Sequence, residues 1–421
     1  MSSPFTPDFG TSPAFLAGRT ALVEAWKAAL RNPRDRLRMA LLLSPRGTGK
    51  TVMLNEIEDL ATGLGMLVVA VDTSTAGVGE RIAEQIETAR EIGAGAADVL
   101  RQPQTETTKS ARLSLGFASL GWSAATPVEP QWSLRRMLTH LASASSAHNS
   151  AMLLSVDELH AADRDEARRL AADVQHVAKR ENLPLCFAGA ALPFFRGAMR
   201  SDRKLSFFNR CAKPTLASIS RADAAGFYRH MIAAANGTVT DEAVDAMATA
   251  CGGNAYKMQH IGHSAWLAAG APRREIGADA ARDAIDAANR IVYEDVFRPL
   301  WEDLTPPERR CLELLAGSAD PLHVAELAAI EADPDGLTAV LDSLVDSGCV
   351  TYDHSSGAVT LGHLGDRESI AEAASVSRHL QNADIAARPL SSHPVCGRPM
   401  QRVTGRCVLP LGHAGRCRSK R

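Results

Sequence analysis

The sequence predicts an α/β fold: a parallel sheet covered by helices, then an all-α region, a winged helix and a small metal-binding tail. Amphipathic segments of helical length alternate with short apolar runs, a rhythm typical of parallel sheets covered on both faces. Four of these runs have the length of buried strands, at residues 40–43, 66–71, 152–156 and 185–189. Residues 101–133 interrupt the rhythm, and their short alternating runs predict a hairpin or an inserted loop.

Composition and charge narrow the class of protein. The 421 residues are enough for two to four domains, and 45% hydrophobic and 22% charged residues are ordinary for a globular chain. Lys and Arg total 46 and Asp and Glu total 48, so the net charge of −2 excludes a globally basic nucleic-acid binder, though not a local basic patch. No apolar run is long enough for a membrane helix, the N-terminus lacks a signal-peptide pattern, and five cysteines are scattered singly. We therefore expect a cytoplasmic protein with no membrane partner.

A loop containing two glycines follows the first predicted strand and leads into a predicted helix. It reads Ser44-Pro45-Arg46-Gly47-Thr48-Gly49-Lys50-Thr51, followed by Val52. Strand, loop and helix in this order predict a phosphate-binding P-loop, the Walker A motif. Gly47 and Gly49 let successive N–H groups turn toward an anion at the helix N-terminus. Lys50 would bind the β- and γ-phosphates of ATP, and Thr51 would offer its hydroxyl to Mg²⁺. Ser44 stands where the pattern has glycine, and we expect this small residue to preserve nucleotide affinity.

Two acidic residues end the third predicted strand. Asp157 and Glu158 directly follow the apolar run of residues 152–156, which is the form of a Walker B strand. The carboxyl ends of parallel strands meet at one edge of a sheet, so both acids should lie beside the P-loop. Asp157 would then hold the Mg²⁺ shell, and Glu158 would orient and deprotonate the attacking water. A solvated acidic pair at a strand end is the alternative.

With both motifs placed, the chain resembles the AAA+ ATPases over residues 14–365. The resemblance is to the archaeal-type and replication-initiator-like clade, which adjoins the STAND signalling ATPases. It implies a parallel-sheet P-loop NTPase core with an all-α lid. Residues 15–19 resemble the family's Gly-Arg box, which implies that Gly18 and Arg19 lie by the adenine. Residues 187–193 resemble the sensor 1 strand and turn but lack its polar residue, which puts γ-phosphate sensing there in doubt.

Two weaker resemblances bear on catalysis and on assembly. Residues 206–210 are similar to the segment that holds an arginine finger, which makes Arg210 the candidate; a surface arginine in a salt bridge is the alternative. A finger acts on a neighbour's nucleotide, so this role implies a homo-oligomer whose isolated subunit hydrolyses ATP slowly. Residues 252–256 resemble the Gly-Gly-Asn-Pro turn of the lid, where Tyr256 replaces the sensor 2 arginine and Lys257 is adjacent.

The tail carries four potential metal ligands. Cys396, Cys407, His413 and Cys417 have the spacing C-x₁₀-C-x₅-H-x₃-C, which fits a structural Zn²⁺ site, with His393 as a competing ligand. A disordered tail with free thiols is the alternative. Residues 393–421 contain seven Lys and Arg and no Asp or Glu, so nucleic acid is a possible partner there, as is the protein's own acidic winged helix.

The predicted winged helix has the opposite charge. From Cys311 to Asp366 there are ten acidic residues and no Lys or Arg, a surface that would repel duplex DNA. We therefore expect it to contact a protein partner or another subunit. The predicted divisions of the chain are an extended arm (1–13), an AAA+ P-loop ATPase core (14–215), a helical lid (216–290), a winged helix-turn-helix (291–380), a linker (381–392) and a zinc-knuckle-like basic tail (393–421).

These interpretations together predict a nucleotide-driven conformational switch that hydrolyses ATP with Mg²⁺. Two alternatives stay open. One is a signalling scaffold that holds a nucleotide without hydrolysing it, which the altered sensors favour and Glu158 opposes. The other is a DNA-handling ATPase of the replication-initiator or transposition-helper type.

Overall fold

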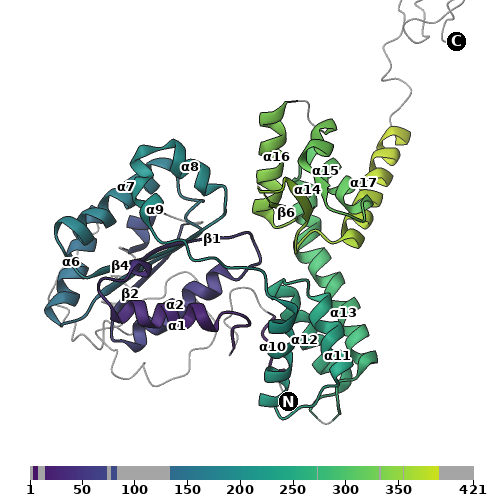
Figure 1. The fold of residues 1–421 in the computed structure, drawn as a ribbon, viewed down its shortest axis with the longest axis horizontal. Coiled ribbons are helices and arrows are strands. Elements are labelled where there is room, and N and C mark those ends of the chain that lie inside the picture. The colour runs from purple at the N-terminus through teal and green to yellow at the C-terminus, as the bar shows by residue number, and fades with distance from the viewer. Residues whose placement is uncertain are drawn as a thin grey trace, which may run out of the picture. The chain divides into compact units, whose positions relative to one another are not determined.

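A computed structural model describes most of the chain (Figure 1). The described residues are 3–7, 15–73, 77–82, 133–272, 274–330, 333–353 and 355–387. The hairpin or loop expected at 101–133 and the four tail residues expected to bind zinc lie outside these ranges. Residues 1–366 form one compact unit, and helix α17 (Arg367–Ala387) belongs to a second. Helix α17 continues into the predicted linker, whose first residues are therefore helical.

The centre of the first unit is a parallel sheet of four strands. The strands are β1 (Met39–Leu43), β2 (Leu67–Asp72), β3 (Met152–Asp157) and β4 (Leu185–Ala191), in the order β1-β4-β3-β2. All four predicted strands are thus confirmed. Every pairing is parallel, and Asp157 at the end of β3 is in register with Asp72 at the end of β2. The carboxyl ends of all four strands therefore meet at one edge, which is where the P-loop begins.

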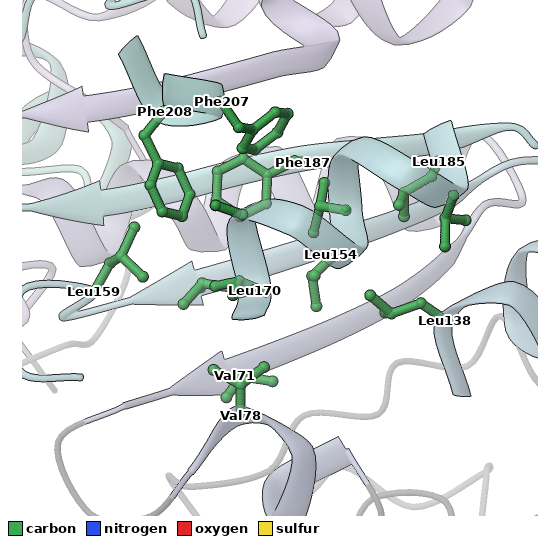
Figure 2. Packing of buried hydrophobic residues seen from close by; sticks show 14 of the residues in the cluster. Val71, Val78, Leu138, Leu154, Leu159, Leu170, Leu185, Phe187, Phe207 and Phe208 are labelled. Carbon is green, nitrogen blue, oxygen red and sulfur yellow. The ribbon is translucent and has the colours of Figure 1, made fainter. Parts of the chain in front are cut away.

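Side chains that alternate along the strands fill two apolar layers, one on each face of the sheet. On β3, Leu153 packs with Ile57 of α2 (Lys50–Gly63) and Trp26 of α1 (Thr20–Arg31). Its neighbour Leu154 faces the other way, into the layer drawn in Figure 2. That layer contains Leu138 of α6 (Leu134–Ala147) and Leu170 of α7 (Arg164–Gln175), a helix that a π-helical turn continues to Arg180. The predicted covering of both faces by helices is confirmed.

The short helices after β4 close the second layer. Helix α8 (Phe195–Ser201) and helix α9 (Ser206–Arg210) follow the turn at the end of β4. Phe207 and Phe208 of α9 contact the ring of Phe187 on β4, at centroid distances of 5.7 and 5.8 Å (Figure 2). These rings fix the α9 segment, and hence Arg210, against the sheet.

A helical region with its own apolar core follows the sheet. It consists of α10 (Arg221–Ala234), α11 (Asp241–Ala250), α12 (Ala255–Ala269) and α13 (Ala278–Val292). The side chains of Ser220, Thr240 and Asn254 accept hydrogen bonds from the first turns of α10, α11 and α12, which explains where these helices begin. Phe5 of the N-terminal arm is buried in this core, and a Cβ on Gly262 would lie 2.4 Å from its ring.

Residues 306–366 form a segment of helices and a small antiparallel sheet, which we call the hairpin segment. It follows α14 (Arg298–Asp303) and contains α15 (Pro306–Gly317), a 3₁₀ turn (Val324–Ala329) and α16 (Pro334–Ser347). Strands β6 (Val350–Asp353) and β7 (Ala358–Leu361) form an antiparallel hairpin, and β5 (Leu322–His323) pairs with β7. Within the predicted winged helix, Val324–Ala329 is a 3₁₀ turn and not a regular α-helix. Within the described ranges, no helix combines the length and apolar character needed to cross a membrane.

Candidate nucleotide-binding site

The loop between β1 and α2 has the backbone of an anion-binding loop. Gly47 and Gly49 have φ angles of 76° and 88°, a left-handed conformation that glycine adopts without a side-chain clash. Helix α2 begins at Lys50, directly after Gly49, so its free N–H groups and the positive end of its dipole lie at the loop. This geometry fits a phosphate group, as the sequence predicts for a P-loop.

Two hydroxyl groups hold the loop in shape. Ser44 is buried, and its Oγ donates to the carbonyl oxygen of Leu216 at 3.1 Å. Thr48 Oγ1 donates to the carbonyl oxygen of Pro45 at 2.9 Å, which closes the loop on itself. Ser44, the departure from the usual glycine, is therefore a small side chain that ties the loop to the segment leading into the helical region.

Lys50 is buried at the base of the loop. Its Nζ donates to the carbonyl oxygens of Ser44 and Pro45, both at 2.9 Å, and the residue is 6% exposed. Burial lowers the pKa of Lys50, while the nearby carboxylates of Glu158 and Asp157 raise it. Two of the three ammonium protons are used by the carbonyls, which leaves the third for a phosphate oxygen.

Thr51 and Asp157 bring the P-loop and the end of β3 together. Thr51 Oγ1 donates to Asp157 Oδ2 at 2.7 Å, and Asp157 Oδ1 accepts from the N–H of Glu158 at 2.8 Å. Burial raises the pKa of Asp157, while these two hydrogen bonds lower it. A hydroxyl and a partly buried carboxylate in contact are hard oxygen donors that fit Mg²⁺, whose charge would offset the cost of burying the carboxylate.

Glu158 occupies a backbone conformation unusual for a residue with a side chain. Its φ of 50° lies in the left-handed region. Glu158 Oε2 lies 3.1 Å from Nε2 of His160, and the Glu158 side chain is 35% exposed. His160 is not part of the predicted motifs, although it stands only two positions after the Walker B glutamate.

Arg19 links the loop to the segment before α10. Its Nη2 donates to the carbonyl oxygens of Thr48 at 3.1 Å and of Ala217 at 2.7 Å. Burial lowers the pKa of Arg19, while Asp223 raises it. Gly18 has a φ of 66°, and a Cβ there would meet the carboxylate of Asp223 at 2.9 Å. The two residues of the Gly-Arg box therefore lie beside the P-loop.

The structure does not bring every predicted site residue to this place. Arg210 is exposed at the end of α9, and its Nη2 donates to Gln175 Oε1 at 2.6 Å rather than to the P-loop. Lys257 contributes its backbone N–H to the Asn254 cap of α12. Arg210 as a finger toward a neighbouring subunit stays a prediction. The zinc ligands Cys396, Cys407, His413 and Cys417 stay a prediction as well.

Three further residues reach the loop from distant parts of the chain, and no motif indicates that they do. Asn254 is fully buried; its Oδ1 caps α12, and its Nδ2 has no hydrogen-bond partner among the described residues. That Nδ2 lies 3.9 Å from where a Cβ on Gly47 would be. His363 Nε2 lies 2.6 Å from the carbonyl oxygen of Arg46. Burial lowers the pKa of His363, while this hydrogen bond raises it.

The third of these residues is Asp346, near the end of α16. Its Oδ1 accepts from the N–H of Phe194 at 2.9 Å, and its carbonyl oxygen accepts from the N–H of Arg46 at 3.3 Å. Burial raises the pKa of Asp346 to about 6. The hairpin segment thus contacts the P-loop through two separate turns, which no local pattern in the sequence indicates.

Comparisons with known proteins place this geometry in a known fold. No protein-family model and no curated protein matches the sequence. Among solved structures, the ORC2 protein of Aeropyrum pernix with ADPNP and ADP is 15% identical, at a TM-score of 0.58 over 90% of this chain and 98% of that chain. A Walker-type ATPase of Pyrococcus abyssi is 13% identical, at a TM-score of 0.57 over 88% of this chain and 98% of that one. The chain has the α/β fold of the P-loop NTPases. The predicted parallel-sheet α/β core is thereby confirmed, while the winged helix and the metal-binding tail stay predictions.

Proposed function

We propose that this chain is an AAA+ ATPase of the replication-initiator-like class, which binds ATP with Mg²⁺ and hydrolyses it to ADP and phosphate. The observation that carries this proposal is the contact of 2.7 Å between Thr51 of the P-loop and Asp157 of β3. It joins a phosphate-binding loop and a metal-binding acid in one site, with Lys50 and Glu158 beside it. The likeness to the fold of an ORC2 protein that was solved with ADPNP and ADP supports the same conclusion.

Each residue of the site would have a separate role in ATP hydrolysis. The amides of the P-loop and the ammonium of Lys50 would bind the β- and γ-phosphates and stabilise the charge that develops there. Thr51 and Asp157 would hold Mg²⁺, which when bound neutralises part of the phosphate charge. Glu158 would orient a water molecule on the γ-phosphorus and take its proton as the new P–O bond forms. The bond to the bridging oxygen breaks, and its electron pair stays on ADP.

The same site allows a second function, that of a scaffold which holds its nucleotide and rarely hydrolyses it. One observation favours it: the sensor 1 strand has only small residues at its end. Ala188, Ala190 and Ala191 are buried and offer no polar side chain to a γ-phosphate. Glu158 opposes it, because a non-hydrolysing scaffold has no need of a positioned base.

The lid, the hairpin segment and the basic tail are the parts of the chain that we expect to contact partners. The nucleotide would switch the position of the lid and the hairpin segment, and the acidic surface of the latter would bind a protein partner or another subunit. The basic tail would hold one structural Zn²⁺ and is the part suited to nucleic acid, which a DNA-handling ATPase would need.

Substitution of Glu158 separates the two functions. Glu158→Gln keeps the size and hydrogen-bonding groups of the side chain but cannot accept the water's proton. We expect unchanged ATP affinity by calorimetry and phosphate release reduced by about 10²–10⁴-fold. Release should be measured over a range of protein concentrations, with and without DNA. Phosphate release that the substitution leaves undiminished would remove Glu158 from the mechanism, and no release by the wild type would favour the scaffold.

A further inference from the structure

We propose that His160 is a positioning residue that holds the carboxylate of Glu158 toward the phosphate site. This inference rests on the proposed ATPase function and names a residue that the P-loop and Walker B motifs do not include. His160 lies in the loop between β3 and α7, two positions after Glu158.

The backbone at Glu158 is fixed by contacts from three sides. A left-handed conformation costs a residue with a side chain roughly 1–2 kcal/mol, so it persists only where neighbours enforce it. Here Thr73 Oγ1 donates to the carbonyl oxygen of Glu158 at 2.7 Å, as does the N–H of Ala161, also at 2.7 Å. The next residue, Leu159, donates its N–H to the carbonyl oxygen of Ala190 at 2.9 Å. The main chain is therefore held, and the direction of the carboxylate depends on what binds the side chain.

Hydrogen bonds determine which nitrogen of His160 carries the proton. The N–H of Leu192 donates to Nδ1 at 3.4 Å, so Nδ1 is an acceptor without a proton. The proton of a neutral imidazole is then on Nε2, which lies 3.1 Å from Glu158 Oε2 and donates to it. Burial, together with the positive charges of Lys50 and Arg46, lowers the pKa of His160 to about 4, so the ring is neutral at pH 7. His160 therefore acts as a hydrogen-bond donor to Glu158 and not as a second base.

The imidazole ring is itself held in place. The His160 side chain is only 8% exposed, and the ring of Phe194 meets it edge-on at a centroid distance of 5.5 Å and an angle of 88°. Phe194 and Leu192 belong to the turn that follows β4, the strand that lacks a polar sensor side chain. The turn after β4 therefore contacts Glu158 indirectly, because its residues hold the His160 ring and that ring contacts the glutamate.

Glu158 directly follows Asp157, which contacts Thr51 of the P-loop at 2.7 Å, so the glutamate lies beside the phosphate site. Its charge also raises the pKa of Lys50. With Oε2 bound to His160, Oε1 remains for the attacking water. Without the donor, the carboxylate would sample several rotamers and would less often be in position, while the P-loop contacts to the nucleotide would persist.

Three variants test the inference by separating kcat from nucleotide binding. His160→Leu removes the donor at similar volume, His160→Gln can return an N–H near the position of Nε2, and His148→Leu removes an exposed histidine at the end of α6 as a control. We expect His160→Leu to lower kcat by roughly 10–100-fold, the range found when a hydrogen bond that orients a metal ligand is lost. ATP affinity by calorimetry should change less than about 3-fold. His160→Gln should recover most of kcat, and His148→Leu should match the wild type.

Three kinetic results would overturn the inference, and a fourth result is spectroscopic. The kinetic ones are an unchanged or raised kcat in His160→Leu, a loss of ATP affinity in that variant that accounts for its whole effect, and a His160→Gln variant as slow as His160→Leu. In the spectroscopic test, ¹⁵N NMR of the intact protein at pH 7 should show the His160 ring neutral and protonated on Nε2, and any other state contradicts the geometry. Failure of the proposed function looks different: the wild type would then bind no ATP or release no phosphate, whatever stands at position 160.

Discussion

Asp346→Asn is expected to stabilise the protein above about pH 4, with the full effect above about pH 6. The carboxyl of Asp346 accepts a hydrogen bond from the N–H of Phe194 and is mostly buried, and burial raises its pKa from 3.8 to about 6. The folded protein therefore binds this proton more tightly than the unfolded chain does. Below about pH 4 both states carry the proton and there is no cost. Between about pH 4 and 6 the unfolded chain releases the proton while the folded protein still holds it, so stability falls progressively, and the loss is complete above about pH 6.

The size of the effect follows from the shift in pKa. From 3.8 to about 6 the shift is about 2 units. At 1.36 kcal/mol per unit, this gives an upper limit of about 3 kcal/mol. Solvent reaches part of the carboxyl group, so we expect about 1–2 kcal/mol. Asparagine retains an oxygen that can accept from Phe194 and has no charge to bury, so the variant should gain this amount above pH 6.

Thermal unfolding of the two proteins at pH 4, 6 and 7.5 measures the gain. We expect equal melting temperatures at pH 4 and a variant more stable by about 2–4 °C at pH 7.5. Asp342→Asn is the matched control, because it removes an exposed charge from the same helix. Since Asp342 contributes to the raised pKa of Asp346, a smaller gain of the same sign is expected there. A variant that is less stable at pH 7.5, or a gain that is the same at pH 4, would refute the reasoning.

Two further predictions concern parts of the chain beyond the central site. Arg210→Ala should leave ATP affinity unchanged. If Arg210 is the finger, the specific ATPase activity of the wild type rises with protein concentration, and the variant should lose that rise, with a rate about 10³-fold or more lower at saturation. A wild-type rate that does not depend on concentration would contradict that role. Metal analysis of the full chain should find one zinc per molecule, and Cys407→Ser should lower that content; a wild-type protein free of zinc after purification without chelators would contradict the predicted site.

The sequence predicted the sheet and the P-loop because both depend on local patterns. The four strands are continuous apolar runs. Because the two acids stand at the end of β3, they must lie at the edge where the parallel strands end. The glycines at 47 and 49 have the left-handed angles that the loop requires. Each of these expectations needed only residues close together in the chain.

The missed residues reach the site from distant parts of the chain. His363 and Asp346 approach Arg46 across about 300 positions, and nothing in the local sequence around them indicates this contact. Asn254 was visible in the lid turn, but only the structure shows that its Nδ2 is buried with no hydrogen-bond partner among the described residues. Inside the predicted winged helix, Val324–Ala329 forms a 3₁₀ turn, which its short apolar pattern does not distinguish from an α-helix.

Calorimetric titration of ATP with Mg²⁺ into the wild type and into Lys50→Ala tests the account most directly. Lys50 lies at the base of the loop with the carboxylates of Asp157 and Glu158 nearby, so its loss should remove the positive charge on which phosphate binding depends. We expect saturable binding by the wild type and none detectable by the variant. A variant that is folded and binds ATP as tightly as the wild type would contradict it.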